Sequence, residues 1–332
     1  MRRSGGRGRA GATLALLLAG AGACGGGGGE KPPTFTPVSA TSDGAGLYTL
    51  TLGDLRMVVD GAKGARITEF SLRGTNVLVT HDQNHDNFGS TYWPSPQSSW
   101  CTAGGGCWPP PAAIDGGAYT GAIDTANSIQ LASAEQSIAG IAGSAVTVTK
   151  QFSPVPESGA VDVTYTLTNA SPTDNVSLAP WQVSRLATGG LTFFGQGSGP
   201  VTYAPNTSST FTLNEMAGAL WYLYEPVTHD SKAFADGTGW IAQVTPDRLL
   251  YLVSYPDFEP ADGAPGEAEI ELYTNSSGVY VEFEQQGALA AIAPGASMTW
   301  TVRWKLRRLP AGTTVAPGNA DLASFAAAAL AE

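Results

Sequence analysis

Residues 298–306 read MTWTVRWKL, a run in which large apolar side chains alternate with polar ones. The apolar set is Met298, Trp300, Val302, Trp304 and Leu306, and the polar set is Thr299, Thr301, Arg303 and Lys305. Successive side chains of a β-strand point to opposite faces, so a period of two predicts a strand with one buried and one solvated face. Such half-buried strands are typical of antiparallel sheets.

The same period recurs along most of the chain. Residues 48–52 and 161–167 alternate in the same way, and roughly fifteen such runs are separated by clusters of Gly, Pro, Asn and Ser. The 42 glycines and 22 prolines disfavour long helices. The exception is the alanine-rich end of the chain, where Asn319 is a suitable N-cap. We therefore expect an all-β chain: one large antiparallel β-sandwich over residues 47–309, then a C-terminal tail, residues 310–332, with one helix.

The N-terminal segment has the pattern of a secretory leader. Several arginines precede an apolar run, residues 12–23, that is too short to span a bilayer, so residues 1–23 are predicted to be a signal peptide. The small residues before Cys24 resemble a bacterial lipobox, and residues 24–46 are expected to be a lipidated Cys24 followed by a flexible linker. We expect an exported, membrane-anchored lipoprotein, periplasmic or at the cell surface, that contacts the membrane through this anchor only.

Charge and metal-ligand patterns exclude several functions. The chain has 17 Lys and Arg against 28 Asp and Glu, a formal net charge of −11. No basic patch remains in the mature chain, so nucleic acid is not an expected partner. His81, His85 and His229 include no H-E-x-x-H sequence, and the spacing of four between His81 and His85 on a polar loop is a weak metal signal that solvated loop histidines also explain. The two cysteines at 101 and 107 are too few for a structural zinc site. No metal and no cofactor are expected.

Residues 90–111, STYWPSPQSSWCTAGGGCWPPP, cannot form ordinary secondary structure because prolines lock the backbone at several positions. Cys101 and Cys107 enclose a glycine-rich turn, and in an exported protein they are expected to form a disulfide. That bond would fix Trp100 and Trp108 relative to each other. The stretch therefore predicts a rigid, irregular loop that holds large aromatic faces in place.

Two uses fit such a loop, and the residue types leave both open. The loop is either a lid whose tryptophans plug into the core, or one wall of a binding cleft. In a cleft, indole faces such as that of Trp93 would stack on the apolar faces of a sugar ring, and Gln97 would hydrogen-bond its hydroxyls.

Residues 266–287, GEAEIELYTNSSGVYVEFEQQG, predict a β-hairpin that turns at residues 275–278. The expected cross-strand pairs are Tyr273–Tyr280, Glu271–Glu282 and Glu269–Glu284. Carboxylates gathered on one face repel each other. They form either a solvated acidic surface or a sugar site in which at least one carboxylate has a raised pKa and acts as general acid or base.

Residues 181–186, WQVSRL, place Trp181 and Arg185 on one face of a further strand. Arg185 would neutralise the acidic face, bind a polar ligand, or form a structural ion pair.

These three regions together resemble the galactose-mutarotase-like superfamily. The resemblance is greatest to a bacterial branch with a W-P-x-P-Q/E motif followed by W-P-P-P. Here the motif is residues 93–97, WPSPQ, and residues 108–111, WPPP, preceded by NFG at 87–89. The resemblance covers residues 47–309. It implies a β-supersandwich with a carbohydrate site on its concave face.

The resemblance also implies roles for individual residues. Aldose epimerases of this superfamily use a histidine acid and a late-strand glutamate base, and Glu284, or neighbouring Glu282, fits the base. WQVSRL stands where those enzymes carry a histidine and has none, which leaves His229 as the downstream candidate. The expected carbohydrate-binding set is Trp93, Gln97, Trp100, Trp108, Trp181, Arg185 and Glu271.

Two functions follow. The first is a carbohydrate-binding lipoprotein that takes a mono- or oligosaccharide, with an aldose 1-epimerase or related sugar isomerase as its enzymatic form. The alternative is a non-enzymatic structural or assembly lipoprotein of the cell envelope that keeps the sandwich without an active site. Convergence of Trp93, Trp108, Trp181, Arg185 and Glu282 or Glu284 on one cleft would favour the first. Their dispersal over separate faces, or their burial in the core, would favour the second.

Overall fold

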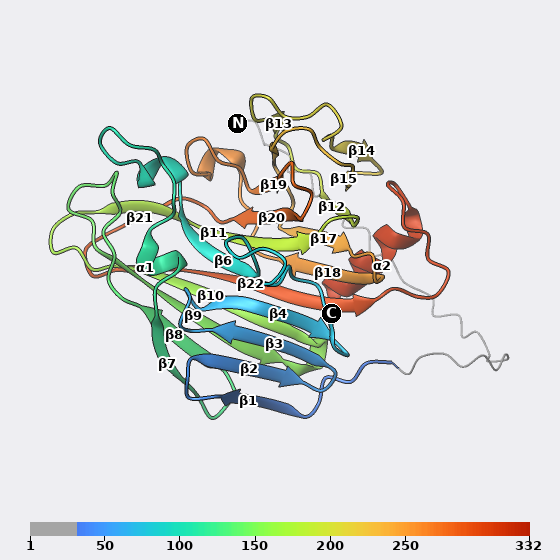
Figure 1. The fold of residues 1–332 in the computed structure, drawn as a ribbon, viewed down its shortest axis with the longest axis horizontal. Coiled ribbons are helices and arrows are strands. Elements are labelled where there is room, and N and C mark those ends of the chain that lie inside the picture. The colour runs from blue at the N-terminus through green and yellow to red at the C-terminus, as the bar shows by residue number, and fades with distance from the viewer. Residues whose placement is uncertain (1–31) are drawn as a thin grey trace, which may run out of the picture. The chain divides into compact units, whose positions relative to one another are not determined.

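The strands form two antiparallel sheets (Figure 1). The computed structural model describes residues 32–332, so the predicted leader, Cys24 and the first part of the linker lie outside the described residues. The twelve-stranded sheet runs in the order β1 (Val38–Ser42), β2 (Leu47–Leu52), β3 (Leu55–Asp60), β4 (Arg66–Leu72), β6 (Ser90–Ser95), β11 (Val176–Ala187), β20 (Tyr280–Gln286), β19 (Ile270–Thr274), β16 (Ser231–Ala235) and β13 (Thr202–Tyr203), with β5 (Thr75–Asn76) beside β4 and β21 (Ala290–Ile292) beside β11.

The second sheet has ten strands. Its order is β14 (Asn214–Met216), β15 (Ala219–Leu223), β12 (Leu191–Gly195), β17 (Trp240–Val244), β18 (Leu249–Ser254), β22 (Ser297–Arg308), β10 (Ala160–Asn169), β9 (Val146–Val155), β8 (Ile129–Ser133) and β7 (Tyr119–Ile123). The prediction of two antiparallel sheets is confirmed. The two sheets hold more strands than the roughly fifteen predicted runs, and strands of two residues, such as β5 and β13, are too short to show a period.

The main core lies between the two sheets. Phe70 of β4 contacts Trp304 of β22 edge to face at 5.2 Å between ring centroids, and Tyr251 of β18 lies 5.0 Å from the same indole. On β22, Trp300, Val302, Trp304 and Leu306 are all buried, as the period of two predicts. Large aromatic rings from both sheets therefore fill the layer between them.

The polar face of β22 departs from expectation at its end. Lys305 and Arg307 are buried because the C-terminal helix, α2 (Ala320–Ala331), covers them. The Lys305 ammonium donates to the backbone carbonyl of Ala329 at 2.6 Å, and Arg307 pairs with Glu332 at 2.6 Å. The end of this strand is thus covered on both sides, whereas Thr299, Thr301 and Arg303 stay exposed or half-buried, as predicted.

Helix α2 confirms the prediction of one C-terminal helix. The Leu322 amide donates to the Asn319 side chain at 2.8 Å, so Asn319 is the N-cap. Leu322, Ala326 and Ala329 pack on the ten-stranded sheet in a second apolar cluster with Phe193. Shorter helical turns are α1 (Ala112–Asp115), η1 (Gln97–Trp100), η2 (Pro156–Ser158) and η3 (Pro260–Asp262). Within residues 32–332 no helix has the length and apolar character needed to cross a membrane.

The linker expected to extend to residue 46 is ordered in its last part. Strand β1 (Val38–Ser42) pairs with β2 along its whole length and forms an edge of the twelve-stranded sheet. The sandwich therefore begins before residue 47. The sequence did not predict this strand because an exposed edge strand needs no apolar face. Its Pro-, Thr- and Ser-rich surroundings therefore show no clear alternation of apolar and polar residues.

Candidate functional site

The candidate site lies on the outer face of the twelve-stranded sheet, across strands β6, β11, β20, β19 and β16. On β11, Gln182 hydrogen-bonds Tyr165 and Trp304 of the opposite sheet, so its side chain points into the layer between the sheets. Its neighbour Trp181 and the next residues of that face, Val183 and Arg185, therefore point outward. Trp181 pairs with Trp93 of β6, and Arg185 pairs with Glu282 of β20.

The hairpin at residues 270–286 forms, but with a different register from the one predicted. Tyr273 lies opposite Glu282, and Glu271 lies opposite Glu284. The expected pairs Tyr273–Tyr280, Glu271–Glu282 and Glu269–Glu284 are therefore wrong by two residues. A shift of two keeps every side chain on its face, so Glu271, Glu282 and Glu284 still gather on one side.

A long-range contact explains the shift. Asp230, which precedes β16, accepts hydrogen bonds from the Ser276 amide at 2.9 Å and from the Tyr273 hydroxyl at 2.9 Å. These bonds hold a loop of residues 275–279 that is wider than the tight turn suggested by Asn-Ser-Ser-Gly. Local turn propensity carries no information about a partner so distant in sequence.

Four tryptophans cluster above the sheet. The Trp93 ring lies 5.7 Å from that of Trp100, 5.6 Å from Trp108 and 5.2 Å from Trp181. Trp93, Trp100 and Trp181 are buried, whereas Trp108 is 58% exposed. Trp93 and Trp100 therefore pack with Trp181 of β11, as the lid interpretation expects, whereas Trp108 presents its face to solvent, as a cleft wall would require.

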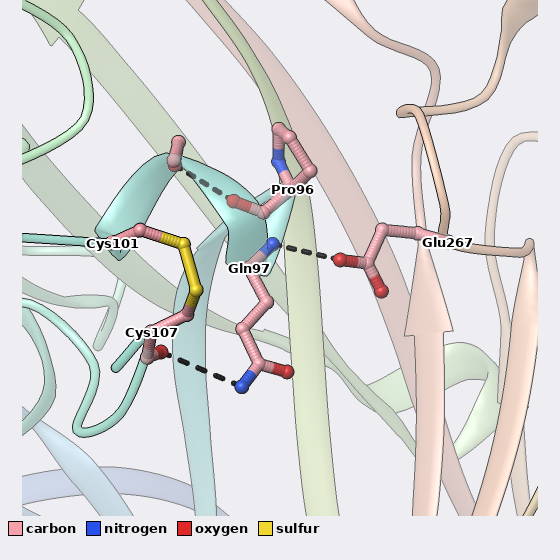
Figure 2. The surroundings of a disulfide bond; sticks show 6 residues. Pro96, Gln97, Cys101, Cys107 and Glu267 are labelled. Carbon is pink, nitrogen blue, oxygen red and sulfur yellow. Dashed lines mark hydrogen bonds between the residues drawn. A yellow bond between two sulfur atoms is a disulfide. The ribbon is translucent and has the colours of Figure 1, made fainter. Parts of the chain in front are cut away.

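The loop is held by the Cys101–Cys107 disulfide and by Gln97 (Figure 2). The Gln97 backbone nitrogen donates to Glu267 Oε1 at 2.7 Å, and the Gln97 side-chain nitrogen Nε2 donates to the Cys107 carbonyl at 3.5 Å. Gln97 thus lies between the disulfide and the segment that leads into β19. This arrangement fixes the tryptophan loop against the hairpin, although the two are far apart in sequence.

The acidic face is paired rather than solvated. Arg185 Nε lies 2.9 Å from Glu282 Oε1, and the Arg185 guanidinium lies 5.3 Å from the centre of the Trp93 ring. Lys232 Nζ lies 2.5 Å from Glu271 Oε2 and 3.3 Å from Glu284 Oε2. Lys232 from β16 therefore neutralises two carboxylates that would otherwise repel each other.

Glu269 does not belong to this group. Its two carboxylate oxygens accept from the backbone amides of Gly237 and Gly239, at 2.9 and 3.0 Å. The predicted set of four mutually facing carboxylates is therefore reduced to three.

Protonation follows from this crowding. Burial raises the pKa of the Glu284 carboxyl well above its usual range, the Glu271 and Glu282 carboxylates raise it further, and the Lys232 ammonium opposes them. Burial alone lowers the pKa of Lys232, but Glu271 and Glu284 outweigh it, so the net shift is upward. One ammonium faces two carboxyls, and the arrangement favours a charged Lys232 with one carboxyl holding a proton.

A pocket of about 380 Å³ opens beside the exposed indole. It is lined by Asn87, Trp93, Gln97, Trp108, Trp181, Lys232, Tyr273, Tyr280 and Glu282. Five of the residues singled out from the sequence therefore lie around one hollow. Arg185, Glu271 and Glu284 are buried next to it and do not line it, and Trp100 is packed behind Trp93 and Trp181.

His229 stands apart from this hollow. It is exposed and does not line the pocket, and its ring nitrogen lies 3.0 Å from the Thr228 hydroxyl. The other four lining residues were not among the expected site residues: Asn87, Lys232, Tyr273 and Tyr280. Lys232 stands in a short strand whose alternation is weak, and a single lysine there gives no signal of its contacts. No cluster of three metal-ligating side chains occurs in residues 32–332.

Neither a scan against models of protein families nor a search of curated proteins found a match to this sequence. Solved structures do match. A candidate aldose 1-epimerase from Escherichia coli K12 superposes with a TM-score of 0.52 at 12% identity, over 82% of this chain and 99% of that one. The protein has the galactose-mutarotase-like fold.

Two further solved structures are similar to this chain. A TPR-domain-containing protein from Parabacteroides distasonis matches with a TM-score of 0.53 at 12% identity, over 82% of this chain but only 49% of its own. A galactose mutarotase-like protein from Clostridium acetobutylicum gives a TM-score of 0.49 at 9% identity, over 84% of this chain and 100% of its own. At 12% identity the two matches with TM-scores above 0.5 show the fold alone, and the function must be argued from the site.

Proposed function

We propose that this protein binds carbohydrate in the pocket beside Trp108. The observation that carries the proposal is the composition of one hollow: an exposed indole face, with Gln97, Lys232 and Glu282 around it. A sugar ring has apolar C–H faces and a rim of hydroxyls. It therefore needs a flat aromatic surface together with fixed polar groups, and this pocket has both.

The polar groups are held in place before any ligand arrives. Glu282 is fixed by Arg185, and Lys232 by Glu271 and Glu284. Side chains that are already immobilised lose little conformational entropy on binding, which favours affinity. The likeness in fold to a candidate aldose 1-epimerase supports a sugar as the ligand.

Binding without turnover is the form of this function that the geometry favours. An epimerase needs an acid and a base in reach of the sugar ring. Glu284, the expected base, is fully buried and accepts a hydrogen bond from the Trp181 indole at 3.0 Å. The carboxylate that borders the pocket is Glu282.

NMR of anomer exchange with each bound sugar measures turnover directly. An exchange rate in the wild type that Glu282→Gln abolishes would establish the enzymatic form instead.

The structural or assembly alternative predicts that these residues scatter over separate faces or are buried in the core, and Trp93, Trp100, Trp181 and Arg185 are indeed buried. The grouping of Trp93, Gln97, Trp108, Trp181 and Glu282 around one hollow, with Trp108 exposed, supports the binding function over that alternative.

The test of binding is Trp108→Ala. Because Trp108 is 58% exposed, the variant should melt like the wild type. Its affinity for a sugar found on a glycan array should fall by roughly 1–3 kcal/mol, the scale for losing an aromatic anchor. Isothermal calorimetry provides the measurement, and Leu47→Ala, another exposed apolar residue, is the matched control. Unchanged affinity in a folded Trp108→Ala variant would place the binding site elsewhere.

We also propose that the protein is an exported lipoprotein anchored through Cys24, periplasmic or at the cell surface. The support is the leader sequence and the glycine run at residues 25–29. Mass spectrometry of membrane fractions should find a lipid-modified N-terminal cysteine, and Cys24→Ser should release the protein into the soluble fraction. A mature protein that is soluble with an unmodified terminus contradicts this proposal.

A further inference from the structure

A second hollow lies beside the proposed sugar pocket. It has a volume of about 440 Å³, and its lining includes Phe234, Phe258, Asp236, Glu267 and Glu269. Phe234 and Phe258 are both half-buried, so each offers part of its ring to a ligand. The second hollow therefore repeats the chemistry of the first, with aromatic surface next to carboxyl groups.

Two contacts show that the hollows adjoin. Gln97 lines the sugar pocket, and its backbone amide donates to Glu267, which lines the second hollow (Figure 2). Lys232 stands between the two: its ammonium lies 5.0 Å from the centre of the Trp181 ring and 5.5 Å from that of Phe234. One lysine side chain thus contacts an aromatic ring of each hollow.

The carboxyl groups of the second hollow differ in their hydrogen bonds and in their position relative to the first hollow. Asp236 accepts from the Gly199 amide at 2.8 Å, and both Glu269 oxygens accept from backbone amides, so these two are committed to the fold. Glu267 is held as well, since its Oε1 accepts from the Gln97 backbone amide at 2.7 Å, but this bond places the half-buried carboxylate where the two hollows meet. A ligand that extends from one hollow into the other would pass it.

We propose that the ligand is an oligosaccharide of at least two units. One ring occupies the pocket beside Trp108, and the next lies in the second hollow against Phe234 and Phe258, with the chain passing Glu267. The inference rests on the proposed carbohydrate binding and names its ligand class. A single monosaccharide would fill only one of two adjoining hollows of similar size.

The experiment compares ligand lengths. The probes are plain hexose and N-acetylhexosamine glycans of one to four units on an array, followed by calorimetry on the glycan bound best and on its constituent monosaccharide. The wild type should bind the longer glycan roughly tenfold or more tightly, as expected when a second aromatic contact is added. Phe234→Ala should remove most of this gain and leave monosaccharide affinity within about twofold, while Trp108→Ala weakens both.

Two variants keep the test decisive. Phe258→Ala removes the other ring of the second hollow and should act like Phe234→Ala, which covers the case in which one variant fails to fold. Leu223→Ala, an exposed apolar residue outside both hollows, should change neither affinity.

The outcomes separate this inference from the proposed function. Equal affinity for the monosaccharide and every longer glycan, with Trp108→Ala still weakening it, overturns the oligosaccharide inference alone. So does an aryl glycoside of one sugar that gains as much affinity as the longer glycan, because the second hollow would then be an aglycone site. Absence of binding to glycans of every length overturns both.

Discussion

Lys150 has surroundings that disfavour its charge. It is buried on β9, its ammonium donates to the Gly64 carbonyl at 2.5 Å, and the Tyr119 ring lies 5.1 Å away. Burial lowers the pKa of Lys150 to about 7, although Asp115 acts in the opposite direction. The unfolded chain therefore binds one more proton than the folded protein between about pH 7 and 10.5, the two pKa values of this group.

It follows that the free energy of unfolding rises with pH across that window. Below about pH 7 Lys150 is charged in the folded protein too, and the cost of burying that charge then lowers the free energy of unfolding in full. Lys150→Met should stabilise the protein at pH 6 by about 1–3 kcal/mol. Removing the buried charge stabilises the folded state by about 1.4 kcal/mol for each unit by which the pKa is lowered. Part of this gain is lost because the Gly64 carbonyl no longer has a hydrogen-bond donor. The gain should shrink towards pH 10. Urea unfolding at pH 6 and pH 9.5 measures it, with exposed Lys63→Met as control. A variant that is less stable than the wild type at both pH values would contradict this account.

At the scale of the element, the sequence predicts what depends on neighbours along the chain. Trp300 and Trp304 of β22 lie on its buried face, as their alternation indicates, and the N-cap of α2 is Asn319. What it does not predict depends on distant partners. Lys305 is buried because a helix twenty-four residues later packs on it, and the hairpin register follows from Asp230.

The tryptophan loop, residues 96–111, is the element on which the proposed binding depends most. The expectation that all of residues 90–111 lack regular secondary structure is wrong for Ser90–Ser95, which form strand β6. The double variant Cys101→Ser, Cys107→Ser should weaken glycan binding several-fold, because it removes the disulfide that fixes the loop between Gln97 and Trp108. The melting temperature should change little, since a loop closed over a sequence separation of 6 restricts the unfolded chain only slightly. Calorimetry and thermal melts give the two readouts. A large fall in melting temperature with normal affinity would assign the disulfide to global stability instead.

At the scale of the whole molecule, the two-layer plan was predictable and the site only in part. Five lining residues of the pocket were expected from residue type, namely Trp93, Gln97, Trp108, Trp181 and Glu282. Which tryptophan faces solvent was not predictable, because Trp93 and Trp108 stand in the same kind of proline-rich context and only packing distinguishes them. Lys232 was missed for a related reason: its partners Glu271 and Glu284 come from two other strands.

Helix α2 covers the outer face of the ten-stranded sheet, and its removal should change the behaviour of the molecule as a whole. Leu322→Asp places a charge in the fully buried interface with Leu191 and Phe193. The helix should undock and expose an apolar surface, so the variant should associate as concentration rises. Size-exclusion chromatography detects this, with Ala327→Asp on the exposed side of the same helix as control. Glycan affinity in dilute solution should persist, because the pocket belongs to the other sheet. A monomeric Leu322→Asp variant would contradict this role of α2.

The cluster of four indoles also gives the protein an optical property of its own. Rings with centroids 5.2 to 6.5 Å apart exchange excitation energy rapidly, so ultraviolet light absorbed by the buried three can be emitted by Trp108, the one in contact with water. A molecule that covers this indole would move its emission to shorter wavelength. The stacked pair Trp100 and Trp181 should add a coupled band to the circular dichroism spectrum that disappears when the loop detaches. Titrations can therefore be followed without any added dye.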